Sequence, residues 1–293
     1  MSKEQRYIIM LAIAALIWGI GFVAQRAAMD HMGPFTFNWI RFGLGGLSLI
    51  PVVLIVEKRN GFNKATITAG IICGLVLFVA AALQQWGIAV TGSAAKSGFI
   101  TGLYIVLTPI LGMFVGRSTH KFVWIGAIFA TAGLYFIANP GTLGISLGVI
   151  ALLGGALGWA VHILVIDRFV GRINALGFSS IQCLVCSILS FGAAFMFEDV
   201  QLAQISAGYI PILYSALISV CIAYTLQVIG QRHVAPAKSA IIFSLESVFG
   251  AAGEAIILGA FMDVRGYIGG ALIFTGIIVS QLRGKKKITG EQQ

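Results

Sequence analysis

The chain has 293 residues, of which 58% are hydrophobic and only 10% are charged, and its formal net charge is +9. Soluble domains carry about 25% charged residues, so this composition excludes an ordinary soluble enzyme, a disordered protein and a disulfide-stabilised scaffold. It predicts a protein that crosses a membrane several times.

Ten apolar runs follow one another along the chain, and each is long enough to cross a membrane as a helix. A transmembrane helix needs about 20 mostly apolar residues. The loops between the runs are too short to hold a soluble domain, so the predicted fold class is an all-α membrane protein with ten transmembrane helices. The predicted spans are residues 7–24, 34–56, 65–87, 94–115, 121–138, 143–166, 175–197, 207–229, 236–259 and 265–282.

Lysine and arginine are distributed unevenly between the two sides that these spans define. With a cytoplasmic N-terminus, fifteen of the 19 fall in inner segments; Arg26, Lys96 and Arg265 fall in outer segments, and Arg41 lies within the second span. Short loops rich in Lys and Arg resist translocation, so this asymmetry predicts that both termini are cytoplasmic. The basic run at 283–287 is expected to anchor the last span, with contact to anionic lipid as the alternative. The positive charge therefore indicates topology and no nucleic-acid partner.

The two halves of the chain resemble each other. The segment SAAKSGFITGLYIVL from Ser93 aligns with APAKSAIIFSLESVF from Ala235, which places Lys96 on Lys238 at an offset of 142. Each half holds five spans, and because five is odd the second half must cross the membrane in the opposite sense. Inverted repeats are a recurrent plan of secondary transporters, with a site near the midplane. The sequence thus predicts two inverted five-helix repeats around a central cavity: residues 1–140, and residues 141–293 with a short basic cytoplasmic tail.

Four stretches of the sequence together indicate a family. They are WGIGF from Trp18, PFTFNWIRFG from Pro34, KSGFITGLYIVLTP from Lys96 and SLESVFGA from Ser244. Taken together they resemble the EamA family of the drug/metabolite transporter superfamily. The resemblance implies a bacterial inner-membrane transporter of amino acids and other small metabolites. It also implies that spans 1, 3, 4, 6, 8 and 9 line the cavity, while spans 5 and 10 lie at the periphery.

The sequence departs from the family in one place. Many members carry a Gly-Glu pair at the end of the fourth and ninth spans, where this chain has Gly116-Arg117 and Gly259-Ala260. No coupling role is therefore expected at these positions.

The helices expected to line the cavity carry amides, aromatic rings and one histidine. Amides and rings offer hydrogen bonds and apolar faces without net charge, which suits an amphipathic solute. Packing is the alternative role for each aromatic residue and for the histidine. The predicted substrate-binding residues are Trp18, Gln85, Tyr104, Trp159, His162, Tyr224, Gln227 and Glu246.

Charged residues inside a predicted span are costly and require a role. Glu246 lies near mid-depth of the ninth span, where it is expected either to face the cavity as an amine or proton site, or to pair with a neighbouring polar group. Glu254 lies eight residues later and has the same alternatives. Arg41 is interpreted as a structural ion pair or as a cap for another helix, with coupling as the alternative. Lys96 and Lys238 begin equivalent spans, where they either reach the membrane interface or gate opposite mouths.

The predicted function is secondary active or facilitative transport of small metabolites, with export of amino acids by alternating access as the first hypothesis. Uptake or exchange of another solute, such as a nucleoside, a quaternary amine or a drug, is the alternative. No enzyme is predicted, because no nucleophile–base pair or metal cluster converges; Cys183 and Cys186 form a CxxC inside an apolar span and are expected to pack there. The expected partners are the bilayer and a small-molecule substrate, without a cofactor. A monomer is sufficient for this plan, and a dimer is the alternative.

Overall fold

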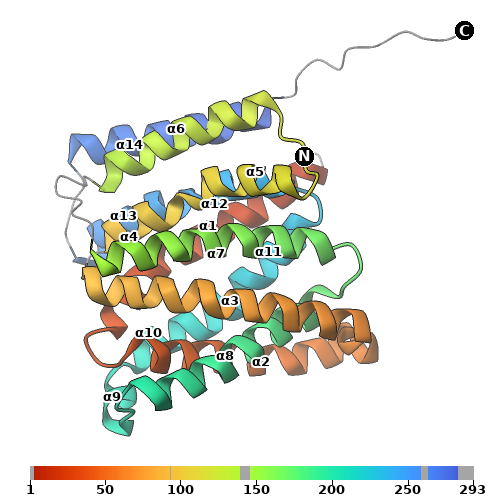
Figure 1. Cartoon of the computed structure of the whole chain (residues 1–293), viewed down its shortest axis with the longest axis vertical. Helices are drawn as coiled ribbons and strands as arrows, with labels where there is room; N and C mark the ends of the chain where they lie inside the picture. Colours follow the sequence, from red (N-terminus) through yellow and green to blue (C-terminus); the bar gives the residue numbers. More distant parts are fainter. Residues whose placement is uncertain (1–2, 93, 139–145, 259–262, 283–293) are drawn as a thin grey trace, which may run out of the picture.

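The computed structural model of the chain describes residues 3–92, 94–138, 146–258 and 263–282, and all regular structure in these residues is helical (Figure 1). The proposed boundary between residues 140 and 141 and the basic run at 283–287 lie outside the described residues. The helices are α1 (Lys3–Ala28), α2 (Pro34–Val56), the 3₁₀ turn η1 (Lys58–Phe62), α3 (Lys64–Thr91), α4 (Ala94–Gly102), α5 (Tyr104–Phe114), α6 (Lys121–Ala138), α7 (Leu147–Phe169), α8 (Ala175–Phe197), α9 (Leu202–Ala207), α10 (Tyr209–Leu213), the π-helical segment η2 (Tyr214–Ala223), α11 (Tyr224–Gln231), α12 (Pro236–Phe243), α13 (Leu245–Leu258) and α14 (Val264–Gln281).

Eight helical stretches of the described residues are long and apolar enough to cross a membrane, and they correspond to the predicted spans 1–4, 6–8 and 10. The predicted fifth span is a shorter apolar helix, Lys121–Phe136. The predicted ninth span is divided between α12 and α13 at Ser244, as the fourth is between α4 and α5 at Leu103, but it is not among the eight. The described residues therefore form an all-helical integral membrane protein with eight spans by length and composition.

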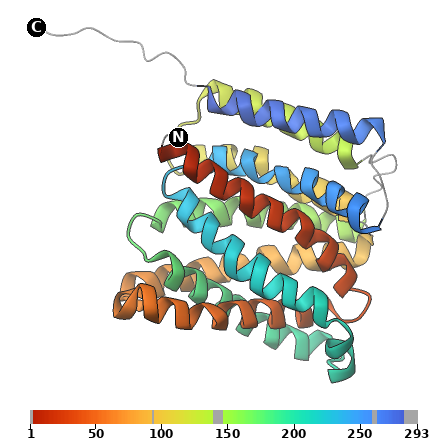
Figure 2. The same ribbon diagram turned by 180° about the vertical axis from the view of Figure 1, so that it is seen from behind.

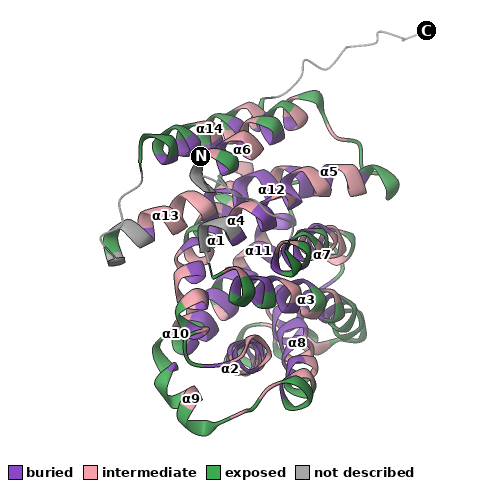
Figure 3. Ribbon diagram, turned by 60° about the vertical axis from the view of Figure 1, so that its left-hand side comes forward, coloured by how far each residue is buried: buried purple, intermediate pink, exposed green. Residues whose placement is uncertain are grey.

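Large apolar side chains point outward on many of these helices. Ile55 on α2, Phe114 on α5 and Ile128 on α6 are 75%, 83% and 69% exposed. Buried residues gather where the helices face one another, and exposed residues gather on the outer faces (Figure 3). An outer surface of this kind suits contact with lipid hydrocarbon, because lipid does not penalise exposed apolar groups.

The helices run roughly parallel or antiparallel to one another in a stack (Figure 1). α6 and α14 pack together at one edge of the stack, and α2 and α8 pack together towards the opposite edge. Between these pairs, α1 lies across the front of the stack in Figure 2 and contacts η2, α11, α12 and α13. The middle of the stack therefore brings together helices from both halves of the sequence.

α2 and α8 cap each other's first turns. Glu57 directly follows α2, and its carboxylate accepts hydrogen bonds at 3.0 and 2.9 Å from two backbone N–H groups at the start of α8. Glu198 directly follows α8 and accepts bonds at 2.7 and 2.8 Å from two N–H groups at the start of α2, and a third from the Thr36 hydroxyl at 2.7 Å. The C-terminal end of each helix thus lies at the N-terminal end of the other, so the two helices are antiparallel. The caps satisfy backbone donors that a helix start leaves unpaired.

Glycines set the contact between α6 and α14. A Cβ atom added at Gly126 would lie 2.5 Å from the backbone oxygen of Gly276, and one added at Gly133 would lie 2.5 Å from the backbone oxygen of Gly269. The two backbones approach more closely than any larger residue allows, as is common where membrane helices associate. Since the later glycine of α6 contacts the earlier glycine of α14, these helices are also antiparallel.

We expect Gly126→Ala to destabilise the protein by about 1–3 kcal/mol, because the new methyl group must push two backbones apart. The matched control is Gly192→Ala on the exposed face of α8, where an added Cβ meets no atom within 4 Å. The control should leave stability unchanged or raise it slightly, since Ala favours a helix over Gly. Thermal unfolding of both variants in detergent measures the difference, and equal midpoints would contradict the close-contact account.

Candidate functional site

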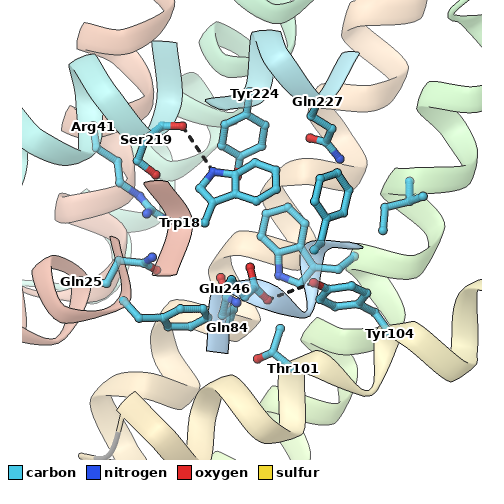
Figure 4. A pocket seen from close by; sticks show the side chains of 14 residues that line it. Trp18, Gln25, Arg41, Gln84, Thr101, Tyr104, Ser219, Tyr224, Gln227 and Glu246 are labelled. Carbon is cyan, nitrogen blue, oxygen red and sulfur yellow. Dashed lines mark hydrogen bonds between the residues drawn. The ribbon is translucent and has the colours of Figure 1, made fainter. Parts of the chain in front are cut away.

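A cavity with an empty volume of about 510 Å³ lies in the middle of the stack. Its walls come from α1, α2, α3, α4, α5, α7, η2, α11, α12 and α13 (Figure 4). The lining residues are Trp18, Phe22, Gln25, Arg41, Gln84, Thr101, Tyr104, Trp159, Ile163, Ser219, Tyr224, Gln227, Phe243 and Glu246.

Aromatic rings form one wall of the cavity. The Trp18 ring stands edge-to-face against Tyr224 and against Phe243, with centroid distances of 5.2 Å in both pairs. Its indole Nε1 donates to the backbone oxygen of Ser219 at 3.3 Å, within the π-helical segment η2. Trp159 adds a second indole 6.3 Å from Tyr224. These contacts fix the rings in place and present flat apolar faces to the cavity.

Glu246 lies in the first turn of α13, directly after a break in the helix. α12 ends at Phe243, and Ser244 separates it from α13. Ser244 keeps right-handed helical backbone angles and its N–H bonds to the backbone oxygen of Ile241 at 3.2 Å, so the interruption is one tight turn. Gly19 allows α1 to approach this point, since a Cβ atom there would lie 2.5 Å from the backbone oxygen of Glu246. The glycine thus brings the α13 start beside Trp18.

Tyr104 holds the Glu246 carboxylate from the other half of the chain. Its hydroxyl donates to Oε1 of Glu246 at 3.0 Å, and both residues are buried (Figure 4). Tyr104 begins α5 directly after Leu103 separates that helix from α4, so it also follows a helix break. The two residues are 142 positions apart, which is the offset of the internal repeat. Equivalent positions of the two halves therefore meet at the centre of the cavity.

Arg41 reaches the cavity from α2 without forming an ion pair among the described residues. Its Nε donates to Oδ1 of Asn38 at 3.0 Å, and the guanidinium lies over the rings of Phe37 and Phe42, 4.9 and 4.7 Å from their centroids. The interpretation of Arg41 as a structural charge, by ion pairing or by capping another helix, therefore stays a prediction. Hydrogen bonding and aromatic faces stabilise the charge.

Most of the predicted site residues lie together around this cavity. Their role in binding a substrate stays a prediction, but the structure places them on one surface from several helices. The predicted residues that line the cavity are Trp18, Arg41, Tyr104, Trp159, Tyr224, Gln227 and Glu246.

Two predicted substrate-binding residues lie behind this surface. The Nε2 of Gln85 donates to the backbone oxygen of Gln25 at 3.3 Å, so its amide is turned towards α1. His162 is fully buried, and its Nε2 shares a hydrogen bond of 3.0 Å with Oε1 of Gln182. Neither residue is among those that line the cavity. Both residues therefore lie behind the cavity lining, where they can hold the lining residues in position.

The predicted gate and coupling charges lie away from the cavity or outside the described residues. Lys238 forms an ion pair with Glu4 at 3.4 Å, which joins the start of α12 to the start of α1. The side chains of Lys96 and Glu254 lie outside the described part of the structure. The gating role of the lysines and the coupling role of Glu254 stay predictions.

Several polar residues of the cavity were not predicted. Gln25 and Thr101, which were not predicted, each hold a buried polar atom without a hydrogen-bond partner in the described residues, as do Gln227 and Trp159, which were predicted. Buried polar atoms usually find partners, so an unpaired group of them at a cavity is suited to a polar ligand or to water. Gln84 lines the cavity in place of Gln85, one position along α3.

A second cavity, with an empty volume of about 920 Å³, lies about one helical turn further along α5 and α11 and adjoins the first cavity on α7. The Nε2 of Gln231 donates to the backbone oxygen of Ile163 at 2.9 Å and so joins α11 to α7 where the two cavities come closest. One turn of helix is about 5.4 Å, so the partition between the cavities is thin. On α5, Tyr104 lines the first cavity and Thr108 the second. On α7 the corresponding residues are Ile163 and Leu164, and on α11 they are Gln227 and Gln231.

The second cavity is polar at its far end. Arg117 and Asp167 line it and pair with each other, and Arg232 donates to the backbone oxygen of Ile173 at 2.7 Å. His233 also lines this cavity and stacks on Tyr7 with a centroid distance of 3.9 Å. Among the described residues no group of three or more His, Cys, Asp or Glu side chains is placed to hold a metal ion.

Comparison with known proteins agrees with this description. The sequence model of the EamA-like transporter family matches residues 5–139 and again residues 146–282. An uncharacterized transporter of Archaeoglobus fulgidus is 29% identical over 274 residues, which cover 93% of this chain and 85% of that protein. The uncharacterized transporter YwfM of Bacillus subtilis (strain 168) is 24% identical over 99% of this chain and 98% of its own length. A solved crystal structure, titled only as that of a protein, has the same fold, with a TM-score of 0.81 at 19% identity over 94% of this chain and 96% of that one.

Proposed function

Because the chain belongs to the EamA-like transporter family, we propose that it carries small metabolites across the membrane by alternating access, with export of amino acids as the leading case. The observation that carries the proposal is the bond between Tyr104 and Glu246. Two equivalent positions, each within two residues of a turn that interrupts its helix, meet in the central cavity. Transporters built from inverted repeats place their site near the membrane midplane, at the interface of the repeats.

The proposed architecture is two inverted five-helix repeats, residues 1–140 and 141–293, which give ten spans when α6 and the divided α12–α13 are each counted as one. Antiparallel packing of equivalent helices supports this arrangement. Glu57 and Glu198, which cap each other's helices, are 141 positions apart, close to the repeat offset of 142. Gly126 of α6 and Gly269 of α14 are 143 positions apart. Reciprocal contacts between equivalent residues are what a pseudo-two-fold axis in the membrane plane would produce.

The proposed orientation places both termini in the cytoplasm of a cell whose inner membrane holds the protein. The charge distribution of the sequence supports it, since Lys and Arg concentrate in segments on the side of the N-terminus. With this orientation the second cavity, which Arg117 and Arg232 line, opens towards the cytoplasm. The pair of Lys238 and Glu4 lies at the same side, where it would gate the cytoplasmic mouth, with Lys96 as its counterpart outside.

The two cavities and the partition between them support the proposal of alternating access. The hydrogen bond from Gln231 to the backbone oxygen of Ile163 holds α11 against α7 between the two cavities. Separation of these helices would join the two cavities and open the site to the cytoplasm, while closure at the outer ends would seal it from the other side. The two inverted halves can exchange such conformations because each resembles the other.

Flux through proteoliposomes tests the proposal. Purified protein is reconstituted, and the efflux of radiolabelled amino acids, a nucleoside and choline is followed against protein-free liposomes. We expect saturable efflux of at least one amino acid. Absence of flux for every amino acid would reject the leading case, and flux of choline or the nucleoside alone would favour the alternative. A quaternary amine is the alternative that the cavity favours, because Glu246 lies among aromatic rings that attract cations.

Gln231→Ala is expected to uncouple transport. The Gln231 side chain bridges the partition, so its removal costs a hydrogen bond of about 1 kcal/mol and opens a path between the cavities. We expect the ratio of accumulated to external cargo to fall several-fold, while downhill efflux becomes faster. Gln201→Ala, an exposed glutamine that precedes α9, is the matched control and should behave as the wild type. An unchanged accumulation ratio in Gln231→Ala would show that the bond does not separate the cavities.

A further inference from the structure

Arg41 carries a positive charge that no carboxylate in the described residues neutralises. Arg41 is only 4% exposed and lies inside the second span. A charge within the membrane costs several kcal/mol unless polar groups or water solvate it, and such a residue usually serves a function. Asn38 and two aromatic rings provide part of this solvation.

The terminal nitrogens of Arg41 are the part of the side chain that is left for a ligand. The hydrogen bond to Asn38 uses Nε, and the two Nη atoms have no hydrogen-bond partner among the described residues. Arg41 lines the central cavity, and in the view of Figure 4 its guanidinium points towards Gln25 and Ser219. A guanidinium with two accessible nitrogens binds a carboxylate through two parallel hydrogen bonds.

Glu246 provides the opposite charge in the same cavity, but the two residues form no salt bridge with each other. Tyr104 binds only Oε1 of this carboxylate, so Oε2 has no protein donor among the described residues. Trp18 lines the cavity with both charged residues, and its rings pack on Tyr224 and Phe243. The cavity therefore offers an anion site, a cation site and apolar aromatic faces within one space.

We propose that the cavity selects an organic zwitterion, and that Arg41 is its carboxylate site while Glu246 binds its ammonium group. This inference rests on the proposed function, in that it takes the central cavity as the transport site. A ligand that carries both charges neutralises both residues at once. A ligand that lacks one charge leaves the other residue buried and unpaired, which costs affinity.

The test compares ligands that differ by one charged group. Binding of L-leucine, 3-methylbutylamine and 4-methylpentanoate to the detergent-solubilised protein is measured by calorimetry. The same comparison is made for L-phenylalanine, 2-phenylethylamine and 3-phenylpropanoate. We expect at least one amino acid to bind about 10- to 100-fold more tightly than both of its truncated forms, as loss of a charge-assisted hydrogen bond predicts. Equal binding of an amino acid and its amine, or no binding in either series, would overturn the proposal.

Substitutions then assign each charge to a residue. Arg41→Gln should lower amino-acid affinity at least tenfold and leave amine affinity unchanged, and Glu246→Gln should lower amine affinity and leave that of the carboxylic acid unchanged. Arg168→Gln and Asp30→Asn, which remove exposed charges, are the matched controls. If Arg41 only stabilised the fold, Arg41→Gln would weaken all ligands alike, and that result would contradict the assignment.

Two further measurements keep the outcomes distinct. If Arg41→Gln does not fold, Arg41→Lys preserves the charge but not the paired nitrogens, and it should retain a weakened preference for the amino acid. If the wild-type protein binds the amino acid no more tightly than the amine that lacks the carboxylate, that result alone would reject the inference. Flux is measured separately in liposomes. Selective binding without flux would reject transport and preserve the inference. Flux of an uncharged solute that Arg41→Gln does not alter would support transport and reject the inference.

Discussion

Glu246→Gln should abolish the accumulation of cargo driven by a pH gradient, while exchange of internal for external cargo continues at reduced affinity. The amide keeps the shape of the side chain and can still accept the hydrogen bond from Tyr104, but it can neither take up nor release a proton. A single carboxylate that binds either a proton or the ammonium group of the cargo couples the two in opposite directions, since both cannot occupy it together. Loss of that carboxylate therefore removes the coupling between proton and cargo but leaves the transport pathway in place.

Proteoliposomes with an imposed pH gradient measure this effect. The accumulation ratio of a transported amino acid should fall to that of protein-free vesicles in Glu246→Gln, and counterflow should remain detectable. Asp30→Asn is the control, because it removes an exposed carboxylate whose partner is Arg26. If Glu246→Gln responds to the pH gradient as the wild type does, Glu246 is not the coupling site, and facilitated diffusion or another residue must explain transport.

Removal of the Glu198 carboxylate should destabilise the protein by about 2–4 kcal/mol. Glu198→Ala deletes three hydrogen bonds at the start of α2 and leaves two backbone N–H groups without their partner. Bonds to a charged group contribute about 1.5–3 kcal/mol each, and loss of a helix cap typically costs about 1 kcal/mol, so the combined effect is large even at a partly exposed site. Asp199→Ala, at the exposed neighbouring position, should have little effect.

Glu57→Ala provides the second half of this experiment, because it removes the reciprocal cap at the start of α8. The two caps lie at opposite ends of a 23-residue helix, about 35 Å apart. Effects at such a distance add, so the double variant should show the sum of the two losses in denaturant-induced unfolding. A double variant as stable as either single variant would mean that the two helices do not rely on these caps.

The sequence was sufficient to predict the helices because their evidence is local. Runs of apolar residues and the alternation of basic loops locate most spans, and eight of the predicted ten appear as helical stretches long enough to cross. The turns that interrupt the fourth span at Leu103 and the ninth at Ser244 both lie in the middle of apolar runs. One residue that leaves the helical pattern changes neither hydropathy nor length, so no sequence signal marks it.

The site was predicted in part, for a reason that Gln84 and Gln85 illustrate. Both lie on α3, and the sequence predicted Gln85 as a cavity residue, but successive helical residues point about 100° apart. The packing of α3 against its neighbours turns Gln84 to the cavity and Gln85 to α1. The reciprocal caps at Glu57 and Glu198 were missed as well, since each joins residues more than 100 positions apart.

Accessibility of two cysteines placed on either side of the partition tests alternating access most directly. Thr101→Cys lies in the central cavity and Thr108→Cys in the second cavity, two turns apart, in a variant whose four native cysteines are replaced. A membrane-impermeant thiol reagent is added to one side of the membrane at a time, with and without cargo. The account predicts that cargo changes the labelling of the two positions in opposite senses. Labelling that rises or falls at both together, or that cargo leaves unchanged at both, would contradict it.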